Sequence, residues 1–206
     1  MKKQFDPVGT WIFYGLSDLY FGSKNLSNHV YRYGTFSYIM ASEKHLKAVL
    51  INNKKDAFEL LDTIEEKRKT VDKLVRSYSH NFKDMIQEVS LLYQKEMNKI
   101  FVPENYDGFD TEKLIQAMYD GYLETRYPSV RSTAKNFPVG TQEGVYHDPL
   151  GSSFFTDFNE TICRNCLIYL KEKGINVAII TADFKERFSD NIGFKNFETQ
   201  YLNRIT

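Results

Sequence analysis

Glu43 and Lys47 form the first pair of side chains whose types and spacing could do chemistry. They are four residues apart, in a segment that we expect to be helical, on a mainly apolar stripe. At that spacing the two side chains lie on one face of a helix and can form an ion pair. Such a pair either fixes the edge of a helical bundle or contacts a ligand directly. Both interpretations stay open, and Glu43 and Lys47 are candidate ligand-binding residues.

A second candidate is a basic patch that contains an aromatic ring. Arg126 and Arg131 flank Tyr127, and Lys135 follows shortly afterwards. The two guanidinium groups could hold phosphate while the tyrosine ring stacks on a base, which makes Arg126, Tyr127 and Arg131 candidate ligand-binding residues. Alternatively, Arg126 pairs with a glutamate and fixes the end of its helix.

Cys163 and Cys166 form a single CxxC motif. A zinc site needs four ligands and the sequence offers no second cysteine pair, while a redox motif would be expected at the start of a helix rather than within one. We therefore expect both cysteines to behave as small buried apolar residues. No Walker glycine loop, G-x-S-x-G, H-E-x-x-H or G-x-G-x-x-G motif is present, so the sequence predicts neither a metal nor a cofactor.

The composition is that of an ordinary globular protein, with 42% hydrophobic and 26% charged residues among 206. Lys and Arg (27) balance Asp and Glu (27), so any nucleic-acid contact must come from a local patch rather than from a global positive charge. No apolar run approaches the ~18 residues of a membrane span, and no secretory signal is visible. We expect a cytoplasmic protein that does not enter the membrane.

Hydrophobic spacing predicts helices over residues 10–28, 29–52, 56–78, 81–98, 110–127 and 155–173. Residues 128–153 read as a long irregular loop, and Gly174 is placed to end the last of these helices. We interpret residues 1–174 as one domain and 175–206 as a C-terminal extension whose β-branched start, at 175–180, favours a strand. Glycines 15, 22 and 34 fall where helices are expected to cross closely. The predicted fold class is all-α, an up-and-down helical bundle.

Three segments, in this order, resemble the HEPN family of helical domains. Residues 41–50 are similar to the A-x-E-K-x-L-K-A-x-L run of its second helix, and residues 79–86 to its H-D-L-x-x-L helix start, with Asn81 and Phe82 where Asp and Leu are usual. Residues 126–129 are similar to its R-Y-P-D helix end, with Ser129 in place of the acid. The resemblance covers roughly residues 10–174 and implies four to five core helices, frequent homodimerisation, and association with nucleotide or RNA.

Some HEPN members are metal-independent ribonucleases that use an Arg and a His separated by four to six intervening residues. The resemblance therefore implies His80 and Arg76 as candidate catalytic residues, although only three residues separate them here. The histidine would exchange a proton with a ribose hydroxyl or a leaving oxygen, and the arginine would stabilise the transition-state charge. A structural alternative is that His80 caps or packs the start of a helix.

We therefore expect a nucleotide- or RNA-associated binding module, in a toxin–antitoxin or stress-response system, with a nucleotidyltransferase-type protein as an expected partner. Two alternatives stay open: a metal-independent endoribonuclease that uses Arg76 and His80, and a helical interaction scaffold that binds no ligand.

Overall fold

A computed structural model describes residues 5–28, 31–106, 109–126 and 153–204. Most of these residues are helical, and the only strands among them are the two-residue pair β1 (Asn105–Tyr106) and β2 (Phe109–Asp110). The helices are α1 (Pro7–Ser27), α2 (Tyr31–Asn53), α3 (Asp56–Glu59), α4 (Ile64–Tyr78), α5 (Phe82–Met97), α6 (Thr111–Arg126), α7 (Ser153–Glu172), α8 (Val177–Phe188), α9 (Phe194–Gln200) and the 3₁₀ turn η2 (Leu202–Arg204). The prediction of an all-α bundle is confirmed.

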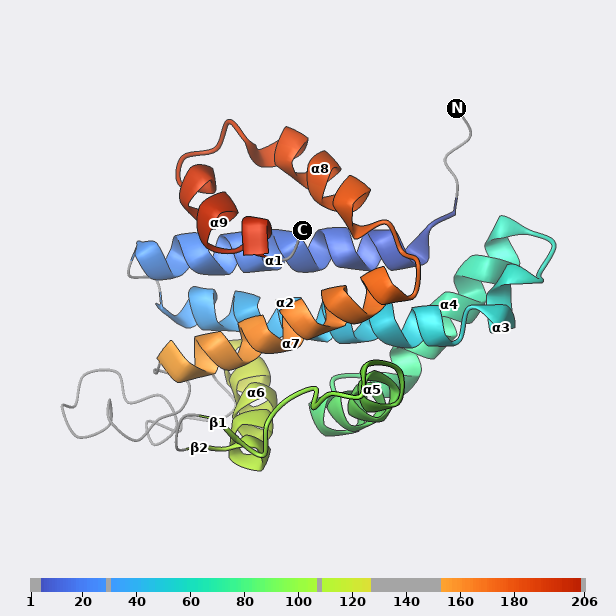
Figure 1. Ribbon diagram of the computed structural model, residues 1–206, viewed down its shortest axis with the longest axis horizontal. Helices are drawn as coiled ribbons and strands as arrows, with labels where there is room; N and C mark the ends of the chain where they lie inside the picture. The colour runs from blue at the N-terminus through green and yellow to red at the C-terminus, as the bar shows by residue number, and fades with distance from the viewer. Residues whose placement is uncertain (1–4, 29–30, 107–108, 127–152, 205–206) are drawn as a thin grey trace.

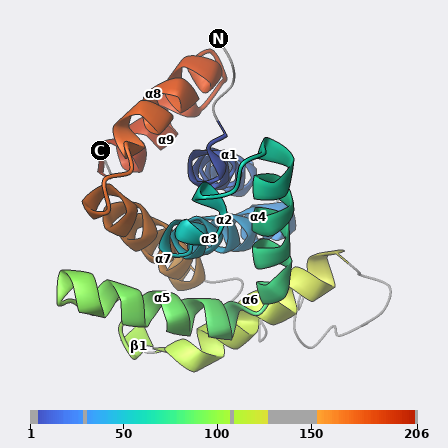
Figure 2. The same cartoon turned by 90° about the vertical axis from the view of Figure 1, so that its right-hand side faces the viewer.

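Helix α2 lies at the centre of the molecule. It runs beside α1, with α7 across it and α5 and α6 below, while α8 and α9 cover the other side of α1 (Figure 1). Viewed along α1 and α2, the other helices surround this pair (Figure 2). Between residues 41 and 52, every α2 residue except Lys44 is buried. The polar residues of this helix therefore lie inside the protein and need partners there.

Glycines let α1 and α2 approach closely, as the sequence predicts. A Cβ at Gly15 would lie 2.5 Å from the ring of His45, and one at Gly22 would lie 2.8 Å from the ring of Tyr38. A side chain at Gly34 would likewise collide with Leu26. Replacing any of these glycines would push the two helices apart.

The segment predicted as one helix over residues 56–78 is instead two helices. The short α3 ends at Glu59, and α4 begins after Thr63. Thr63 and Glu66 form a capping box, in which the threonine hydroxyl accepts from the Glu66 N–H and the glutamate accepts from the Thr63 N–H. Such a box is a strong helix start, and it explains the break.

Residues 175–180 are not a strand, so that expectation was wrong. Asn176 caps α8 by accepting a hydrogen bond from the Ile179 N–H at 3.1 Å. Val177, Thr181 and Phe184 are buried on one face of the helix. Their spacing is helical, and it outweighs the β-branched composition because it lets α8 pack on α1. Gly174, at φ +81°, ends α7 as predicted.

The C-terminal segment joins the hydrophobic core of the bundle through aromatic rings. The ring of Tyr20 on α1 lies 5.6 Å from those of Phe188 and Phe194 and 5.5 Å from that of Phe197. No helix among the described residues is both long and apolar enough to cross a membrane. The loop predicted at 128–153 lies, apart from its last residue, outside the described residues.

Candidate functional site

A tight turn between α4 and α5 carries His80. Ser79 has φ 47° and ψ −122°, and the Asn81 N–H donates to the Tyr78 carbonyl at 2.9 Å. These values are those of the first central residue of a type II′ turn, a position that favours glycine. Asn81 then caps α5 by accepting from the Asp84 N–H. The turn places a strained serine directly before His80, and strained residues of this kind cluster at functional sites.

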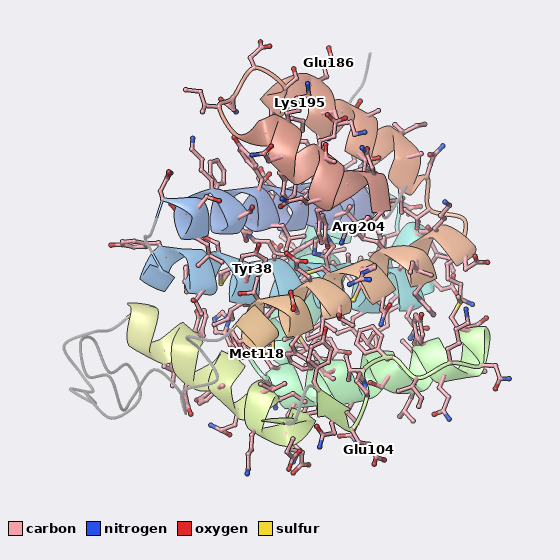
Figure 3. All side chains as sticks on the ribbon, turned by 60° about the vertical axis from the view of Figure 1, so that its left-hand side comes forward. Tyr38, Glu104, Met118, Glu186, Lys195 and Arg204 are labelled. Carbon is pink, nitrogen blue, oxygen red and sulfur yellow. The ribbon has the colours of Figure 1, made fainter. Side chains whose placement is uncertain are left out.

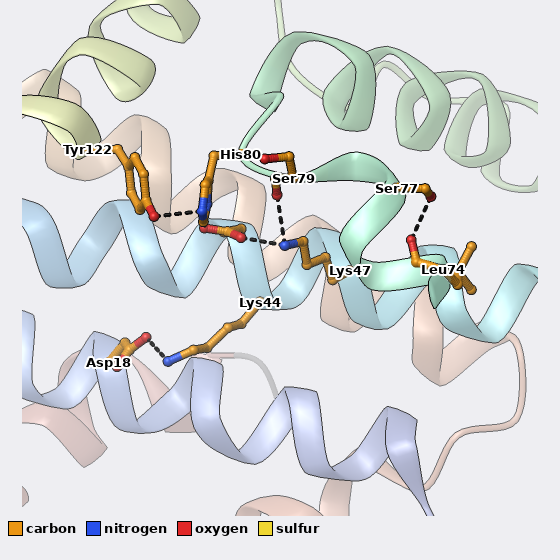
Figure 4. A network of polar contacts seen from close by, with 9 residues as sticks. Asp18, Lys44, Lys47, Leu74, Ser77, Ser79, His80 and Tyr122 are labelled. Carbon is orange, nitrogen blue, oxygen red and sulfur yellow. Dashed lines mark hydrogen bonds and ion pairs between the residues drawn. The ribbon is translucent and has the colours of Figure 1, made fainter. Parts of the chain in front are cut away.

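His80 points from this turn toward α2 and lies between Tyr122 and Lys47 (Figure 4). There its imidazole contacts the buried carboxylate of Glu43. The His80 Nδ1 to Glu43 Oε2 distance is 3.1 Å, and the Lys47 Nζ to Glu43 Oε1 distance is 2.5 Å. The predicted pairing of Glu43 with Lys47 is therefore confirmed. Because a carboxylate only accepts, the His80 Nδ1 must carry a hydrogen.

Tyr122 on α6 contacts the other nitrogen of the imidazole. Its hydroxyl lies 2.6 Å from His80 Nε2, and the two rings lie nearly parallel with centroids 3.9 Å apart. With Nδ1–H directed at Glu43, a neutral His80 uses Nε2 to accept from the Tyr122 hydroxyl. The chain Glu43–His80–Tyr122 is thus a polar relay with two buried ends, because Tyr122 is only 2% exposed, and the imidazole between them is its partly exposed member.

The residues that α2 contributes to this site are buried. The side chains of Glu43 and Lys47 are 3% and 6% exposed, whereas that of His80 is 33% exposed. The Lys47 ammonium also donates to the Ser79 carbonyl at 2.9 Å and lies 5.7 Å from the centre of the Trp11 ring. A buried charge pair of this kind is held by several partners and orients the imidazole, which alone can reach a ligand. We call Glu43, Lys47, His80 and Tyr122 the His80 cluster.

Arg76 does not take part in the His80 cluster. Its side chain is exposed on the last turn of α4 and makes no hydrogen bond or ion pair with any described residue. The cation beside His80 in this structure is Lys47. The main chain of Arg126 ends α6, the helix that carries Tyr122, but its side chain lies outside the described residues. Tyr127 and Arg131 also lie outside the described residues, so their roles stay predictions.

Sequence reasoning missed two members of the site. Nothing in the spacing of Tyr122 sets it apart from the other aromatic residues of its helix. Ser79 carries no sequence signal either, since a positive φ is expected of glycine or asparagine rather than serine. Both depend on how α4, α5 and α6 meet α2.

His45 lies on another face of α2 and, unlike the partly exposed His80, is completely buried. Its Nδ1 contacts the Ala41 carbonyl at 2.8 Å, while Nε2 is buried with no hydrogen-bond partner among the described residues. Burial lowers the pKa of His45 to about 4, so the ring is neutral in the folded protein. It packs against Gly15 and has no access to a ligand.

The cysteines behave as small buried residues, as predicted, and burial raises the pKa of Cys163. No group of three or more His, Cys, Asp or Glu side chains within the described part of the chain could hold a metal ion. Comparison with known proteins yields no matching family model, no matching curated protein and no matching solved structure.

Proposed function

We propose that the chain is a HEPN-like binding module for nucleotide or RNA, acting in the cytoplasm, and that the His80 cluster forms part of its contact surface. The observation that carries the proposal is the His80 imidazole, held between Glu43 and Tyr122 at the surface end of a buried charge pair. The partly exposed imidazole is suited to contact phosphate, while the buried Tyr122 ring stacks on it and holds it in place.

The position of α6 supports a shared surface. This helix carries Tyr122 in the cluster and ends at Arg126, so the basic patch predicted at Arg126, Tyr127 and Arg131 follows directly from the site in sequence. A homodimer, a nucleotidyltransferase-type partner and a place in a toxin–antitoxin or stress-response system belong to the same proposal, because the HEPN resemblance implies them.

The test measures binding of a fluorescein-labelled single-stranded RNA by anisotropy over a range of salt concentrations. We expect weak, salt-dependent binding that falls in the Arg126→Ala and Arg131→Ala proteins, because each phosphate contact contributes to the salt dependence. His80→Ala should also weaken it. Arg68→Ala is the matched control, since Arg68 is exposed on α4 and forms no ion pair with the described residues. Equal losses in all four variants would indicate a non-specific charge effect and contradict the proposal.

The Glu43–His80 hydrogen bond also favours a second candidate, metal-independent RNA cleavage. A carboxylate that fixes Nδ1–H leaves Nε2 as the basic nitrogen, and a ribose 2′-hydroxyl could replace the Tyr122 hydroxyl there. His80 would take the 2′ proton, the 2′-oxygen would attack phosphorus, and the 5′-oxygen would leave and take a proton from water. The products are a 2′,3′-cyclic phosphate and a 5′-hydroxyl.

Cleavage assays separate the two candidates. The enzyme predicts cleavage that persists in EDTA, disappears in His80→Ala and falls in Glu43→Gln. The binding module predicts RNA binding with no cleavage by the unmodified protein. Undiminished cleavage by His80→Ala would remove His80 from the active site, and neither binding nor cleavage would favour the scaffold alternative.

A further inference from the structure

A pocket of about 320 Å³ lies where the C-terminal segment meets the bundle. Its walls come from every layer of this region: α1, α2, α7, α9 and η2. The lining residues are Ser23, Tyr38, Asp157, Glu160, Phe197, Gln200, Tyr201 and Arg204. Figure 3 labels two of them, Tyr38 on α2 and Arg204 on the C-terminal segment. The pocket shares no lining residue with the His80 cluster.

The hydroxyl of Tyr201 is the first indication that the pocket holds a ligand. Tyr201 is 6% exposed, and its hydroxyl oxygen is buried without a hydrogen-bond partner among the described residues. A buried hydroxyl without a partner costs about 1–3 kcal/mol, so native structures rarely leave one. Tyr201 lines the pocket, so a small rotation of its side chain would bring the buried hydroxyl to a ligand that supplies the missing hydrogen bond.

Glu160 supplies a negative charge to the lining of the pocket. Its Oε1 accepts a hydrogen bond from the Tyr38 hydroxyl at 3.1 Å, and Oε2 accepts none from the described residues. Burial raises the pKa of Glu160, and the nearby charge of Asp157 raises it further. Asp157 lies one helical turn earlier on α7 and is exposed at the rim. The Tyr38 hydrogen bond and the charge of Arg164 lower the pKa of Glu160 in part. The Glu160 carboxylate is nevertheless half-buried and hydrogen-bonded through one oxygen only, so its second oxygen can accept from an incoming ammonium group.

Arg204 provides the opposite charge among the lining residues of the pocket. It is exposed, it lowers the pKa of Glu160 by its charge, and yet it forms no ion pair with Glu160 or Asp157. Two opposite charges that line one pocket without touching can each bind one end of a dipolar molecule.

We propose that this pocket binds a small zwitterion, a molecule that carries a primary ammonium group and a carboxylate. The ammonium group has three N–H donors, and it meets the free oxygen of Glu160 and the hydroxyl oxygens of Tyr201 and Tyr38. The carboxylate lies toward the Arg204 guanidinium. The volume accommodates an amino acid of ordinary size, and the mainly polar lining suits a charged molecule better than an apolar one.

Binding would stabilise the whole protein, because the pocket forms only when the C-terminal segment packs on the bundle. A ligand that binds the folded chain alone raises its stability by mass action. The inference is independent of the RNA-binding proposal, since neither the ligand nor the residues are shared.

Isothermal titration calorimetry and thermal unfolding of the full chain test the proposal with matched probes. The zwitterions are glycine, 4-aminobutanoate and 6-aminohexanoate, and the single-charge probes are n-butylamine and butyrate. We expect at least one zwitterion to bind and to raise the melting temperature, butylamine to bind more weakly, and butyrate to give no signal. Failure of all three zwitterions, or equal binding of butyrate, would overturn the proposal.

Two variants assign the binding to this pocket. Glu160→Gln keeps the shape and removes the charge, so it should weaken the zwitterion roughly tenfold or more. Tyr201→Phe removes one oxygen and should weaken it roughly threefold to tenfold while circular dichroism shows an unchanged fold. Glu186→Gln is the control, because Glu186 is exposed on α8, away from both labelled lining residues (Figure 3). Unchanged affinity in Tyr201→Phe and Glu160→Gln would contradict the assignment even if the zwitterion binds elsewhere.

Discussion

The His80 cluster and the Glu160 pocket both place polar groups beside α2, but they satisfy them differently. In the cluster, each oxygen of Glu43 and each nitrogen of His80 has a partner within the chain. In the pocket, the Tyr201 hydroxyl and Glu160 Oε2 form no hydrogen bond with the described residues. The cluster is therefore preorganised without a ligand, whereas the pocket is completed by one. Substitutions of the paired groups in the cluster should then lower the stability, whereas removing an unpaired group of the empty pocket should leave the stability almost unchanged.

The largest expected effect is at Glu43. Glu43→Ala leaves the buried Lys47 ammonium without its carboxylate and His80 without its acceptor, so the free energy of unfolding should fall by about 3–5 kcal/mol. Urea unfolding followed by circular dichroism measures it. Glu65→Ala is the control, because Glu65 pairs with Lys69 at the same i,i+4 spacing on the surface, 66% exposed, and should cost under about 0.5 kcal/mol. Similar losses in the two variants would mean that burial adds nothing to the cluster.

His45 predicts a smaller, pH-dependent effect. The folded protein keeps this ring neutral with a pKa of about 4, while the unfolded chain takes up a proton near pH 6.5. The contribution is fully present above pH 6.5 and is lost as the pH falls toward about 4, which amounts to about 2 kcal/mol between pH 7.5 and 5. Urea unfolding at both pH values should show this loss, and His45→Gln should reduce it. An equal pH dependence in the variant would mean that other groups cause it.

Ser79 tests whether the turn that carries His80 is strained. Ser79→Gly should raise the free energy of unfolding by up to about 1 kcal/mol, because glycine adopts φ 47° without steric cost. The control is Ser77→Gly, two residues earlier in α4, which should lower it by roughly 0.5–1 kcal/mol as glycine does within helices. If both variants lose stability, the turn is not strained. The RNA affinity of the Ser79→Gly protein then shows whether the strained turn contributes to binding.

The smallest effect is expected at Tyr201. In the absence of ligand, Tyr201→Phe removes a hydroxyl that has no partner among the described residues, so thermal unfolding should show a change within about 0.5 kcal/mol or a slight gain. Tyr38→Phe removes the donor to Glu160 and should cost about 1–2 kcal/mol. A clear loss in Tyr201→Phe would show that its hydroxyl already has a partner, and the contrast between the two regions would disappear.

The sequence by itself determined the all-α class and most helix positions, because apolar spacing and caps are local signals. Asn81 and Gly174 mark helix ends that the structure confirms, and the i,i+4 spacing of Glu43 and Lys47 is enough to predict their ion pair. The prediction was wrong at residues 175–180, where the β-branched composition favoured a strand and the apolar spacing a helix. Packing against α1 stabilises the helix.

Only the tertiary structure decided which polar groups meet. His80 and Tyr122 are 42 residues apart, and Tyr38 and Glu160 are 122 apart, so no local pattern connects them. Their contacts depend on α2 being surrounded, because its polar side chains must then find partners on α1, on α7 and in the turn between α4 and α5. Whether Tyr201 is paired or unpaired likewise follows from packing of the C-terminal segment, because a hydroxyl buried between helices no longer has water as a partner.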